Sequence, residues 1–268
     1  MSNNSGHGQA VGRALRILEL LAPERDGLRV TDIANALQLN KAIVFRILSE
    51  LVRNRYVAQD PNSQRYVATF TLAAVGLQKL ESGNLNEWAQ EPLDRLAART
   101  KELVRLAVAE GSSLHWIAKA QGANSGLMVD AAAGKGVQLH ATATGKAWLS
   151  TLDNDHVRDI ISRVGLPAQT PNTITDIETL LADLETVRQH GFATTTEEMD
   201  PGITAVAAPI VRGGGHAGAA VGTVSVAGPA ARLGPEMLEH FAPDVIATAS
   251  ELATRWSIYE QGPNFVVQ

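Results

Sequence analysis

The chain has 268 residues, a formal net charge of −5, 45% hydrophobic residues and no cysteine. This length predicts two domains, the hydrophobic content is that of a globular protein, and the lack of cysteine excludes disulfides, thiolate chemistry and cysteine zinc sites. Because no apolar run reaches the roughly 20 residues of a membrane span, and because the start lacks the apolar core of a signal peptide, we expect a cytoplasmic protein with no membrane partner.

The first predicted helix follows a polar start. Residues 1–10 are small and polar, and we predict a disordered tail there. A helix is predicted from Val11, with one apolar face made of Val11, Ala14, Leu15, Leu18 and Leu21 at helical spacing. Arg13 lies on the polar side of this helix. It is a candidate for a contact with a DNA phosphate, and a solvated arginine is the alternative. Asp26-Gly27 marks the turn that follows.

Residues 31–51 are predicted to form two short helices joined by a tight turn at 38–40. In the first helix, Ile33 and Leu37 recur at helical spacing behind Thr31, whose hydroxyl is expected to cap the helix. The second helix has one apolar face, made of Val44, Ile47, Leu48 and Leu51. Its opposite face carries Ala42, Phe45, Arg46, Ser49 and Arg53.

This opposite face has the chemistry of a DNA reader. It offers two arginines, a hydroxyl and an aromatic ring without a carboxylate, which suits phosphate oxygens and base edges in a major groove. A plain solvated helix hairpin is the alternative for the pattern alone. The candidate DNA-binding residues of this region are Asn40, Lys41, Ala42, Phe45, Arg46 and Ser49.

A β-hairpin is predicted directly after the two helices. Residues 56–59 and 65–70 are β-prone and flank Asp60-Pro61-Asn62-Ser63, which has the composition of a tight turn. A helical hairpin followed by a β-hairpin is a winged helix-turn-helix. Gln64 and Arg65 near the tip of this wing are candidates for contacts with phosphate or an adjacent minor groove.

Charge is distributed unevenly along the chain. Residues 1–70 contain nine Lys and Arg against six Asp and Glu, whereas the remainder contains 14 against 22. A mildly basic first part on an acidic body is expected when only one domain meets DNA.

The segment after the wing predicts a linker and then a helix that opens the second domain. Residues 71–83 have helical spacing and end at Ser82-Gly83-Asn84, where we place the domain boundary. A further amphipathic helix follows from residue 85 to about residue 101, in which Pro92 is expected to bend the helix or to begin its second part.

The larger part of the chain alternates between strands and helices. Strands are predicted at 103–109, 114–120, 127–130, 137–139, 203–211 and 217–226, the last two joined by a hairpin at 212–216. Helices are predicted at 145–151, 154–163, 176–190 and from 235 to about 259. This order favours an α+β fold with helices packed on an antiparallel sheet.

The order and spacing of these elements resemble the IclR family of bacterial transcriptional regulators across residues 11–256. VGRALRILELLA (11–22) is similar to the first helix of the family, and LNKAIVFRILSELVRNRYV (39–57) to its recognition helix. HATATGKAWLS (140–150), EEMDPGITAVAAPI (197–210) and SVAGPAARL (225–233) resemble three effector-domain signatures. The chain departs from the family at three positions. Ala42 and Ile43 replace residues that are often hydroxyl residues in the family, and Arg55 replaces a common glycine.

The resemblance implies a particular domain plan. It has a winged helix-turn-helix domain at 11–70, a linker helix at 71–83, a GAF-like effector-binding and oligomerisation domain at 84–260, and a tail at 261–268. The implied partners are operator DNA, a small organic acid or acid derivative, and further copies of the chain in a homodimer or homotetramer. The implied effector-binding residues are Ala143, Thr144, Thr195, Ala205, Ser225 and Ala227.

Several other features of the second part invite a binding or catalytic interpretation. Thr142 and Thr144 precede a helix start that would offer free N–H groups to an anion, although helix capping explains Thr144 equally well. Lys146 is expected to be solvated or structural, with a carboxylate pair as the alternative. The run GGGHAG (213–218) lacks the ending of a phosphate-binding loop and is predicted to be a hairpin turn. The histidines show no metal-ligand spacing, so we expect neither a metal nor a cofactor.

We favour a ligand-responsive transcriptional repressor that binds a pseudo-palindromic operator. An enzyme acting on a small acid is a second hypothesis, weakened by the lack of a GxSxG motif, a cysteine nucleophile and an evident metal cluster. A DNA-binding protein without a ligand is the third.

The implied pocket positions also predict the type of effector. They offer the methyl groups of three alanines and leave mainly Thr144, Thr195 and Ser225 for hydrogen bonding. A very small acid would need donors on nearly every wall, because burial of an unsatisfied charge is costly. We therefore expect an aromatic or similarly bulky acid or acid derivative rather than a two- or three-carbon acid.

Overall fold

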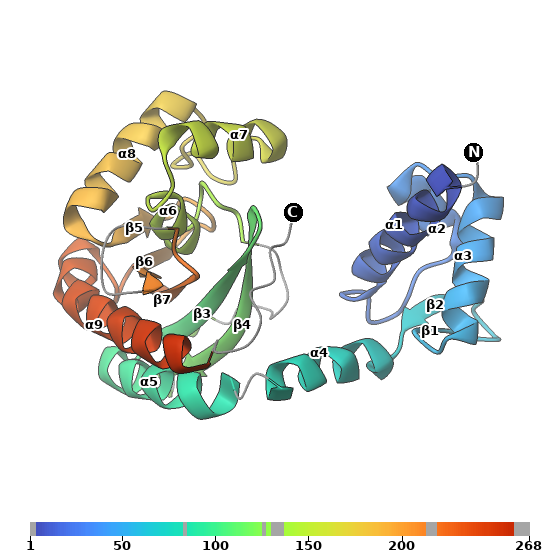
Figure 1. The fold of residues 1–268 in the computed structure, drawn as a ribbon, viewed down its shortest axis with the longest axis horizontal. Coiled ribbons are helices and arrows are strands. Elements are labelled where there is room, and N and C mark those ends of the chain that lie inside the picture. Colours follow the sequence, from blue (N-terminus) through green and yellow to red (C-terminus); the bar gives the residue numbers. More distant parts are fainter. Residues whose placement is uncertain (1–3, 83–84, 125–126, 130–136, 213–218, 260–268) are drawn as a thin grey trace. The chain divides into compact units, whose positions relative to one another are not determined.

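A computed structural model of the chain describes residues 4–82, 85–124, 127–129, 137–212 and 219–259 (Figure 1). The chain divides into two compact units, residues 1–83 and 84–268. Among the described residues, no helix is both long and apolar enough to cross a membrane.

The first unit contains four helices and a short hairpin among its described residues. In chain order these are α1 (Asn4–Leu21), α2 (Val30–Leu37), α3 (Lys41–Arg53), β1 (Val57–Gln59), β2 (Tyr66–Ala68) and α4 (Phe70–Ser82). The expected disordered tail was wrong for residues 4–10, because α1 already begins at Asn4. A hydrogen bond from Arg13 to Gln9, four residues earlier, helps to continue the helix into this polar segment.

The core of the first unit lies where α1, α2, α3 and the hairpin meet. Ile17, Ile33, Val44 and Leu48 are fully buried there, so the apolar faces predicted for α2 and α3 are confirmed. The face predicted for α1 was wrong in part, because Val11 and Leu15 are exposed and Ile17, which was not assigned to it, is buried. Gln38 ends α2 in a left-handed conformation with φ 53° and forms the predicted turn.

One predicted cap in this unit was wrong. Helix α2 begins at Val30 after Arg29, so Thr31 lies inside the helix and does not cap it. Asp32 performs the corresponding role, because its carboxylate accepts a hydrogen bond from the Arg29 N–H at 3.0 Å.

The wing is an antiparallel hairpin, as predicted, with Val57 opposite Ala68. Asp60 holds its turn, since its carboxylate accepts hydrogen bonds from the Ser63 hydroxyl at 2.5 Å and from the Asn62 N–H at 3.0 Å. These two donors hold the pKa of Asp60 below its usual value.

The second unit is built on a five-stranded antiparallel sheet of order β4-β3-β7-β6-β5. Its strands are β3 (Leu103–Glu110), β4 (Ser113–Gln121), β5 (Ala193–Thr196), β6 (Ile203–Ile210) and β7 (Gly222–Pro229). Its helices are α5 (Leu85–Thr100), α6 (Ala143–Leu149), α7 (Asn154–Val164), α8 (Ile177–His190) and α9 (Pro235–Tyr259). Helices α5 and α9 cover one face, whereas α6 and α8 lie over the other (Figure 1). The predicted α+β class is confirmed.

Pro92 lies within α5, so the helix continues through the position at which a bend or a new start was expected. The Trp88 ring of α5 lies 5.2 Å from the Trp256 ring of α9, measured between centroids, and joins the two helices that cover this face.

Three strand predictions in this unit were wrong. The described residues of the expected strands at 127–130 and 137–139 form no strand, and Asp130 lies outside the described residues. Short apolar runs do not make a strand without a ladder partner, and Val137 has only one long backbone bond, 3.4 Å to the Leu114 carbonyl. Strand β7 begins at Gly222, so the described residues 219–221 of the strand expected at 217–226 are not part of it, and the short edge strand β5 was missed.

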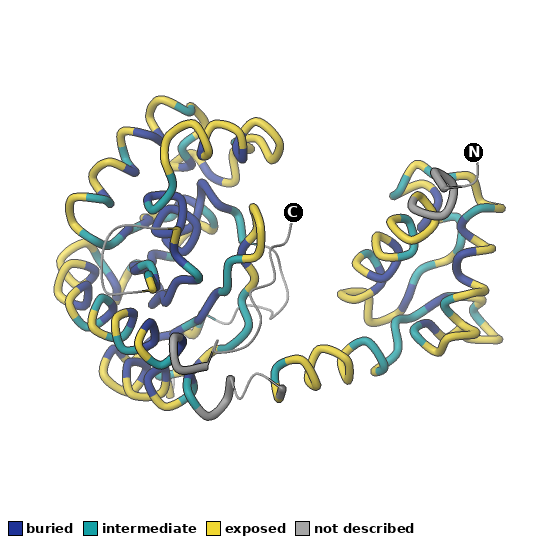
Figure 2. Tube along the Cα trace, viewed as in Figure 1, coloured by how far each residue is buried: buried dark blue, intermediate teal, exposed yellow. Residues whose placement is uncertain are grey.

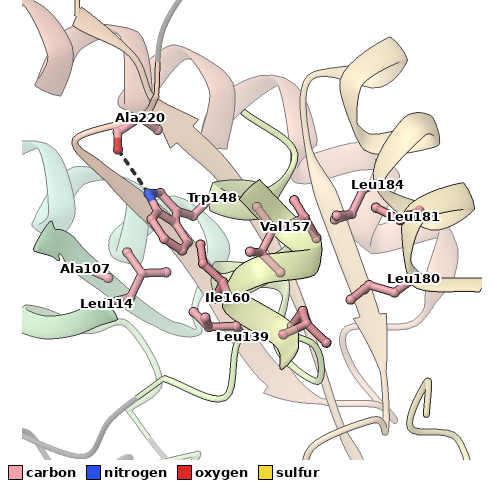
Figure 3. Packing of buried hydrophobic residues seen from close by; sticks show 12 residues of the cluster. Ala107, Leu114, Leu139, Trp148, Val157, Ile160, Leu180, Leu181, Leu184 and Ala220 are labelled. Carbon is pink, nitrogen blue, oxygen red and sulfur yellow. Dashed lines mark hydrogen bonds between the residues drawn. The ribbon is translucent and has the colours of Figure 1, made fainter. Parts of the chain in front are cut away.

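One hydrophobic core of the second unit lies between the sheet and α6, α7 and α8. Trp148 of α6 is buried in a cluster with Leu114 and Ile160, and its indole N–H donates a hydrogen bond to the Ala220 carbonyl at 3.2 Å (Figure 3). Every residue of α6 is buried, whereas the outer turns of α7 and α8 are exposed (Figure 2). The α6 signature segment is therefore the centre of this unit.

Candidate functional site

Helix α3 presents the predicted polar face to solvent. Val44, Ile47 and Leu48 are buried, and the opposite face is exposed (Figure 2). The exposed residues of that face are Ala42, Phe45, Arg46, Ser49 and Arg53. A phenylalanine that is 57% exposed beside an exposed arginine favours an external partner for this surface.

The candidate residues of α3 differ in how far their polar groups are already engaged. Asn40 is the N-cap, and its side chain accepts a hydrogen bond from the Ala42 N–H at 2.8 Å. Ser49 donates to the Phe45 carbonyl at 2.9 Å. Arg53 pairs with Glu50. Arg46, in contrast, has no hydrogen bond or ion pair with any described residue.

The wing candidates are engaged within the domain. Gln64 donates to the Pro61 carbonyl at 2.7 Å and accepts a hydrogen bond from Gln59 at 2.9 Å. Arg65 donates to the Gly27 carbonyl at 2.8 Å and ties the wing to the turn after α1. Sequence reasoning missed this role, because the two residues are far apart along the chain.

Four of the six implied effector-binding residues lie on one face of the sheet. Ala227 of β7 is opposite Ala205 of β6, which is in turn opposite Thr195 of β5. Ser225 precedes Ala227 by two positions on β7, so its side chain points to the same face. All four residues are buried.

Helix α6 lies over this face and contributes the other two residues. Ala143 belongs with Ala205 and Ala227 to a cluster of buried small residues, which lets the helix approach the sheet closely. Thr144 is buried in the first turn. The cap is Thr142, whose hydroxyl accepts a hydrogen bond from the Gly145 N–H at 3.0 Å.

Lys146 of α6 is only 1% exposed and carries a buried ion-pair network. Its Nζ lies 2.7 Å from Oε1 of Glu198 and 2.9 Å from Oδ2 of Asp183. Burial raises the pKa of the Glu198 carboxyl, and the lysine charge partly offsets this. The expectation of a solvated Lys146 was wrong, because the side chain is buried, and the carboxylate pair that was the alternative is present. Its ammonium is therefore already engaged.

His140 lies one turn before α6 and is buried. Its Nε2 lies 3.0 Å from the Pro167 carbonyl. Burial lowers the pKa of His140, the Pro167 hydrogen bond opposes this, and the nearby Lys146 charge lowers the pKa further. His140 is therefore a neutral structural residue near pH 7.

Buried polar atoms without a hydrogen-bond partner gather on the sheet face below α6. Among the described residues, six buried side-chain atoms have no hydrogen-bond partner. Four of them lie on β3, β4 and β7, namely Arg105 Nε, Trp116 Nε1, Thr223 Oγ1 and Ser225 Oγ. The other two belong to Asp183 and Glu198 of the lysine network, where Asp183 Oδ2 still has its ion pair with Lys146. Because native proteins leave few such atoms unsatisfied, this cluster marks a candidate ligand site.

Of these four residues, only Ser225 was predicted from the sequence. One signal for Arg105 was available, because the arginine interrupts the apolar run of β3 (LVRLAVAE). Thr223 and Trp116 carried no signal, because both residue types are common in strands.

No group of three or more metal-ligand side chains occurs among the described residues. The predicted hairpin turn at 213–218 lies outside the described residues. Strands β6 and β7 on either side of it pair antiparallel, from Ile203 opposite Pro229 to Ile210 opposite Gly222.

Comparison with known families assigns both units. Residues 10–61 match the model described as the IclR helix-turn-helix domain, and residues 77–254 match the model described as the bacterial transcriptional regulator IclR C-terminal domain. The first model covers α1 to β1 of the winged domain, and the second covers the end of the linker helix and most of the sheet domain.

Individual relatives agree with the family models. The chain is 29% identical to the HTH-type transcriptional repressor AllR of Escherichia coli, over 92% of this chain and 89% of that protein. A crystal structure of an IclR transcriptional regulator from Alicyclobacillus acidocaldarius is 27% identical, with a TM-score of 0.80 over 92% of this chain and 98% of that one. An IclR homologue from Microbacterium hydrocarbonoxydans, complexed with 4-hydroxybenzoate, shares the fold at 19% identity, with a TM-score of 0.75 over 93% and 99% of the two chains.

Proposed function

Because the chain belongs to the IclR family of bacterial transcriptional regulators, a family that is not enzymatic, we propose that it is a repressor whose affinity for operator DNA changes when an organic acid binds the second unit. DNA binding and transcription regulation follow from the family itself. The observation that carries the ligand-dependent part is the cluster of unpartnered buried polar atoms around Ser225, because a folded protein otherwise satisfies such groups.

The proposed DNA reader is the exposed face of α3. Arg46 supports this assignment best, since its guanidinium is exposed and unengaged among the described residues and suits a bidentate contact with a guanine edge. Lys41, Ala42 and Phe45 flank it on the exposed side. Asn40 and Ser49 keep exposed side chains but already bond to the backbone. Arg13, Gln64 and Arg65 remain proposed phosphate contacts.

Operator symmetry follows from the number of copies that bind. A two-fold homodimer, or a pair of such dimers in a tetramer, places equivalent recognition helices about one DNA turn (roughly 34 Å) apart or a multiple of it. We therefore propose a pseudo-palindromic operator. The repressor role is supported by the similarity to AllR, which is itself a repressor.

The proposed effector lies between α6 and the sheet, with Ser225, Thr195 and Thr144 as its hydroxyl contacts. Ala143, Ala205 and Ala227 present methyl groups on the same wall. An apolar wall with few hydroxyls supports a ligand with a hydrophobic body and one polar end, such as an aromatic acid. This wall gives a two- or three-carbon acid few hydrogen bonds.

Calorimetry tests the effector assignment. Benzoate-type acids should bind the purified full chain, whereas glyoxylate and pyruvate should bind weakly or not at all. Ser225→Ala should weaken the acid that binds by about 0.5–1.5 kcal/mol if the hydroxyl supplies a neutral hydrogen bond. Tight binding of pyruvate without any binding of an aromatic acid would show that the alanine wall was misinterpreted. A thermal-shift screen in which no small acid raises Tm would favour a regulator without a ligand.

A further inference from the structure

The guanidinium of Arg105 lies under α6 without a carboxylate partner. Its Nε is buried and unpartnered, and no carboxylate of a described residue lies within the 4.0 Å of an ion pair. Burial lowers the pKa of Arg105 to about 10, and the charge of Asp200 opposes this shift only in part. The side chain therefore stays protonated at neutral pH and carries a positive charge that forms no ion pair with a described residue.

A second arginine of this unit shows the ordinary arrangement. Arg232 holds the buried Glu102 through two hydrogen bonds, Nε to Oε1 at 2.7 Å and Nη2 to Oε2 at 3.0 Å. This is the two-point geometry that a guanidinium prefers with a carboxylate. Arg105 has no such carboxylate among the residues that the structure describes.

Trp116 fixes the position of the Arg105 guanidinium. The guanidinium carbon lies 3.9 Å from the centroid of the Trp116 ring, which is the geometry of a cation–π contact. The indole N–H of Trp116 is itself buried and unpartnered. The two side chains therefore form a rigid pair that presents unsatisfied N–H donors on one sheet face.

Two hydroxyl groups of β7 complete the cluster. Ser225 is opposite Arg105, and Thr223 is opposite Ala107, which is in turn opposite Trp116. Since opposite residues in a sheet project to the same side, all four polar groups share one face. Two N–H donors and two hydroxyl groups that can donate are the groups that a carboxylate accepts from.

We propose that Arg105, with Trp116, Thr223 and Ser225, binds the carboxylate of the effector, and that the effector is therefore an organic anion. This inference rests on the proposed function and assigns the charged end of the ligand to β3 and β7. The charged end does not lie at Lys146, because that ammonium already has two carboxylate partners. Ligand binding would supply the ion pair that Arg105 lacks.

The first test measures ligand binding by the full chain. Thermal shift is recorded with benzoate, hexanoate and pyruvate, each beside its uncharged amide. At least one carboxylate should raise Tm, and its amide should not. Arg105→Met should weaken that carboxylate by about 10- to 100-fold, and Arg105→Lys should weaken it less, because lysine keeps the charge but loses the planar fork. A carboxylate that binds Arg105→Met as tightly as the wild type would overturn the proposal, as would a panel in which only amides bind.

The second test needs no ligand. If Arg105 serves a ligand and not the fold, Arg105→Met should leave Tm of the ligand-free chain unchanged or raised, since the substitution removes an unpaired buried charge. The matched control Arg232→Met should lower Tm, because it leaves Glu102 buried without its partner. An equal decrease of Tm in Arg105→Met and Arg232→Met would mean that Arg105 stabilises the fold, and it would contradict the proposal.

DNA binding by wild type and Arg105→Met separates the anion site from the proposed regulation. If an acid changes DNA affinity equally in wild type and Arg105→Met, the ligand-responsive regulator stands and the Arg105 assignment fails. If a carboxylate binds through Arg105 but leaves DNA affinity unchanged, the anion site stands and the proposed regulation fails.

Discussion

Lys146 and Glu198 form a buried ion pair across the second unit, with 2.7 Å between Nζ and Oε1. The lysine comes from α6, and the glutamate follows β5 in the chain. This buried pair holds α6 to the loop after β5. Removal of one partner leaves the other charge buried without a counter-charge.

Lys146→Met should therefore destabilise the second unit by about 3–5 kcal/mol. Urea unfolding followed by tryptophan fluorescence measures this, because all four tryptophans belong to residues 84–268. The double variant Lys146→Met/Glu198→Gln should recover part of the loss. Equal stability of Lys146→Met and the wild type would mean that the pair adds nothing to the fold.

His140 predicts a dependence of stability on pH. The unfolded chain takes up a proton near the usual histidine pKa of 6.5, whereas burial lowers the pKa of folded His140. Unfolding therefore binds a proton as pH falls below about 6.5, so the stability of the second unit should fall over that range. His140→Gln should remove this component from a series of urea unfolding curves between pH 7.5 and 5.5.

His156 is the control for this series, because its protonation changes the stability in the opposite direction. Asp153 raises the pKa of the exposed His156, so protonation of His156 favours the folded state as pH falls. His156→Gln should therefore make the acid loss of stability larger. A His140→Gln curve parallel to that of the wild type would refute the role of His140.

Gly145 in α6 should not tolerate a side chain. A Cβ at this position would lie 2.2 Å from the Leu139 carbonyl oxygen, which is backbone and cannot move aside cheaply. Gly145→Ala should cost at least about 2 kcal/mol of stability in the second unit. The matched control is Gly76 in α4, where a Cβ meets nothing within 4 Å, and Gly76→Ala should be neutral or stabilising by up to about 1 kcal/mol. Similar Tm values for the two variants would contradict the close approach.

Arg46→Ala should weaken operator binding by about 1–3 kcal/mol per half-site if the side chain reads a base. Arg25, an exposed arginine between α1 and α2, is the charge-matched control. Fluorescence anisotropy with operator and unrelated DNA separates base reading from general attraction. Arg46→Ala protein that binds its operator unchanged would remove α3 as the reading helix.

Arg65→Ala has two expected effects. The loss of a phosphate contact should weaken binding about equally on all DNA sequences. The loss of the hydrogen bond to the Gly27 carbonyl should also lower the stability of the first unit by about 0.5–1.5 kcal/mol. Circular dichroism at the helix band measures the second effect beside the DNA titration. Unchanged stability would show that the bond to Gly27 is not needed.

Local patterns predicted most of the fold. Helical spacing identified the buried faces of α2 and α3, because Ile33 and Val44 face one core, but in α1 it assigned the exposed Leu15 to the apolar face and left out the buried Ile17. The predicted β3, β4 and β6 agree with the structure to within about a residue or two at each end. The short edge strand β5 was missed, since its four residues carry too little periodicity to mark a strand.

The candidate site could be predicted only in part. Ser225 was found through its signature, but its neighbours Arg105 and Thr223 depend on the pairing of β3 with β7, which joins segments more than a hundred residues apart. Short-range patterns contain no information on such pairing. The same holds for Lys146, whose partners Asp183 and Glu198 come from distant elements, so its burial was not predicted.

An acid bound in the second unit should change the affinity of the first unit for DNA. Operator fragments are selected from genomic DNA on the full chain, and anisotropy titrations are recorded with and without a saturating amount of the acid identified by thermal shift. We predict that the saturating acid changes the DNA affinity of the wild type by about 5- to 150-fold, and that Ser225→Ala needs a several-fold higher acid concentration for the same change. DNA affinity that stays the same at saturating acid would contradict it.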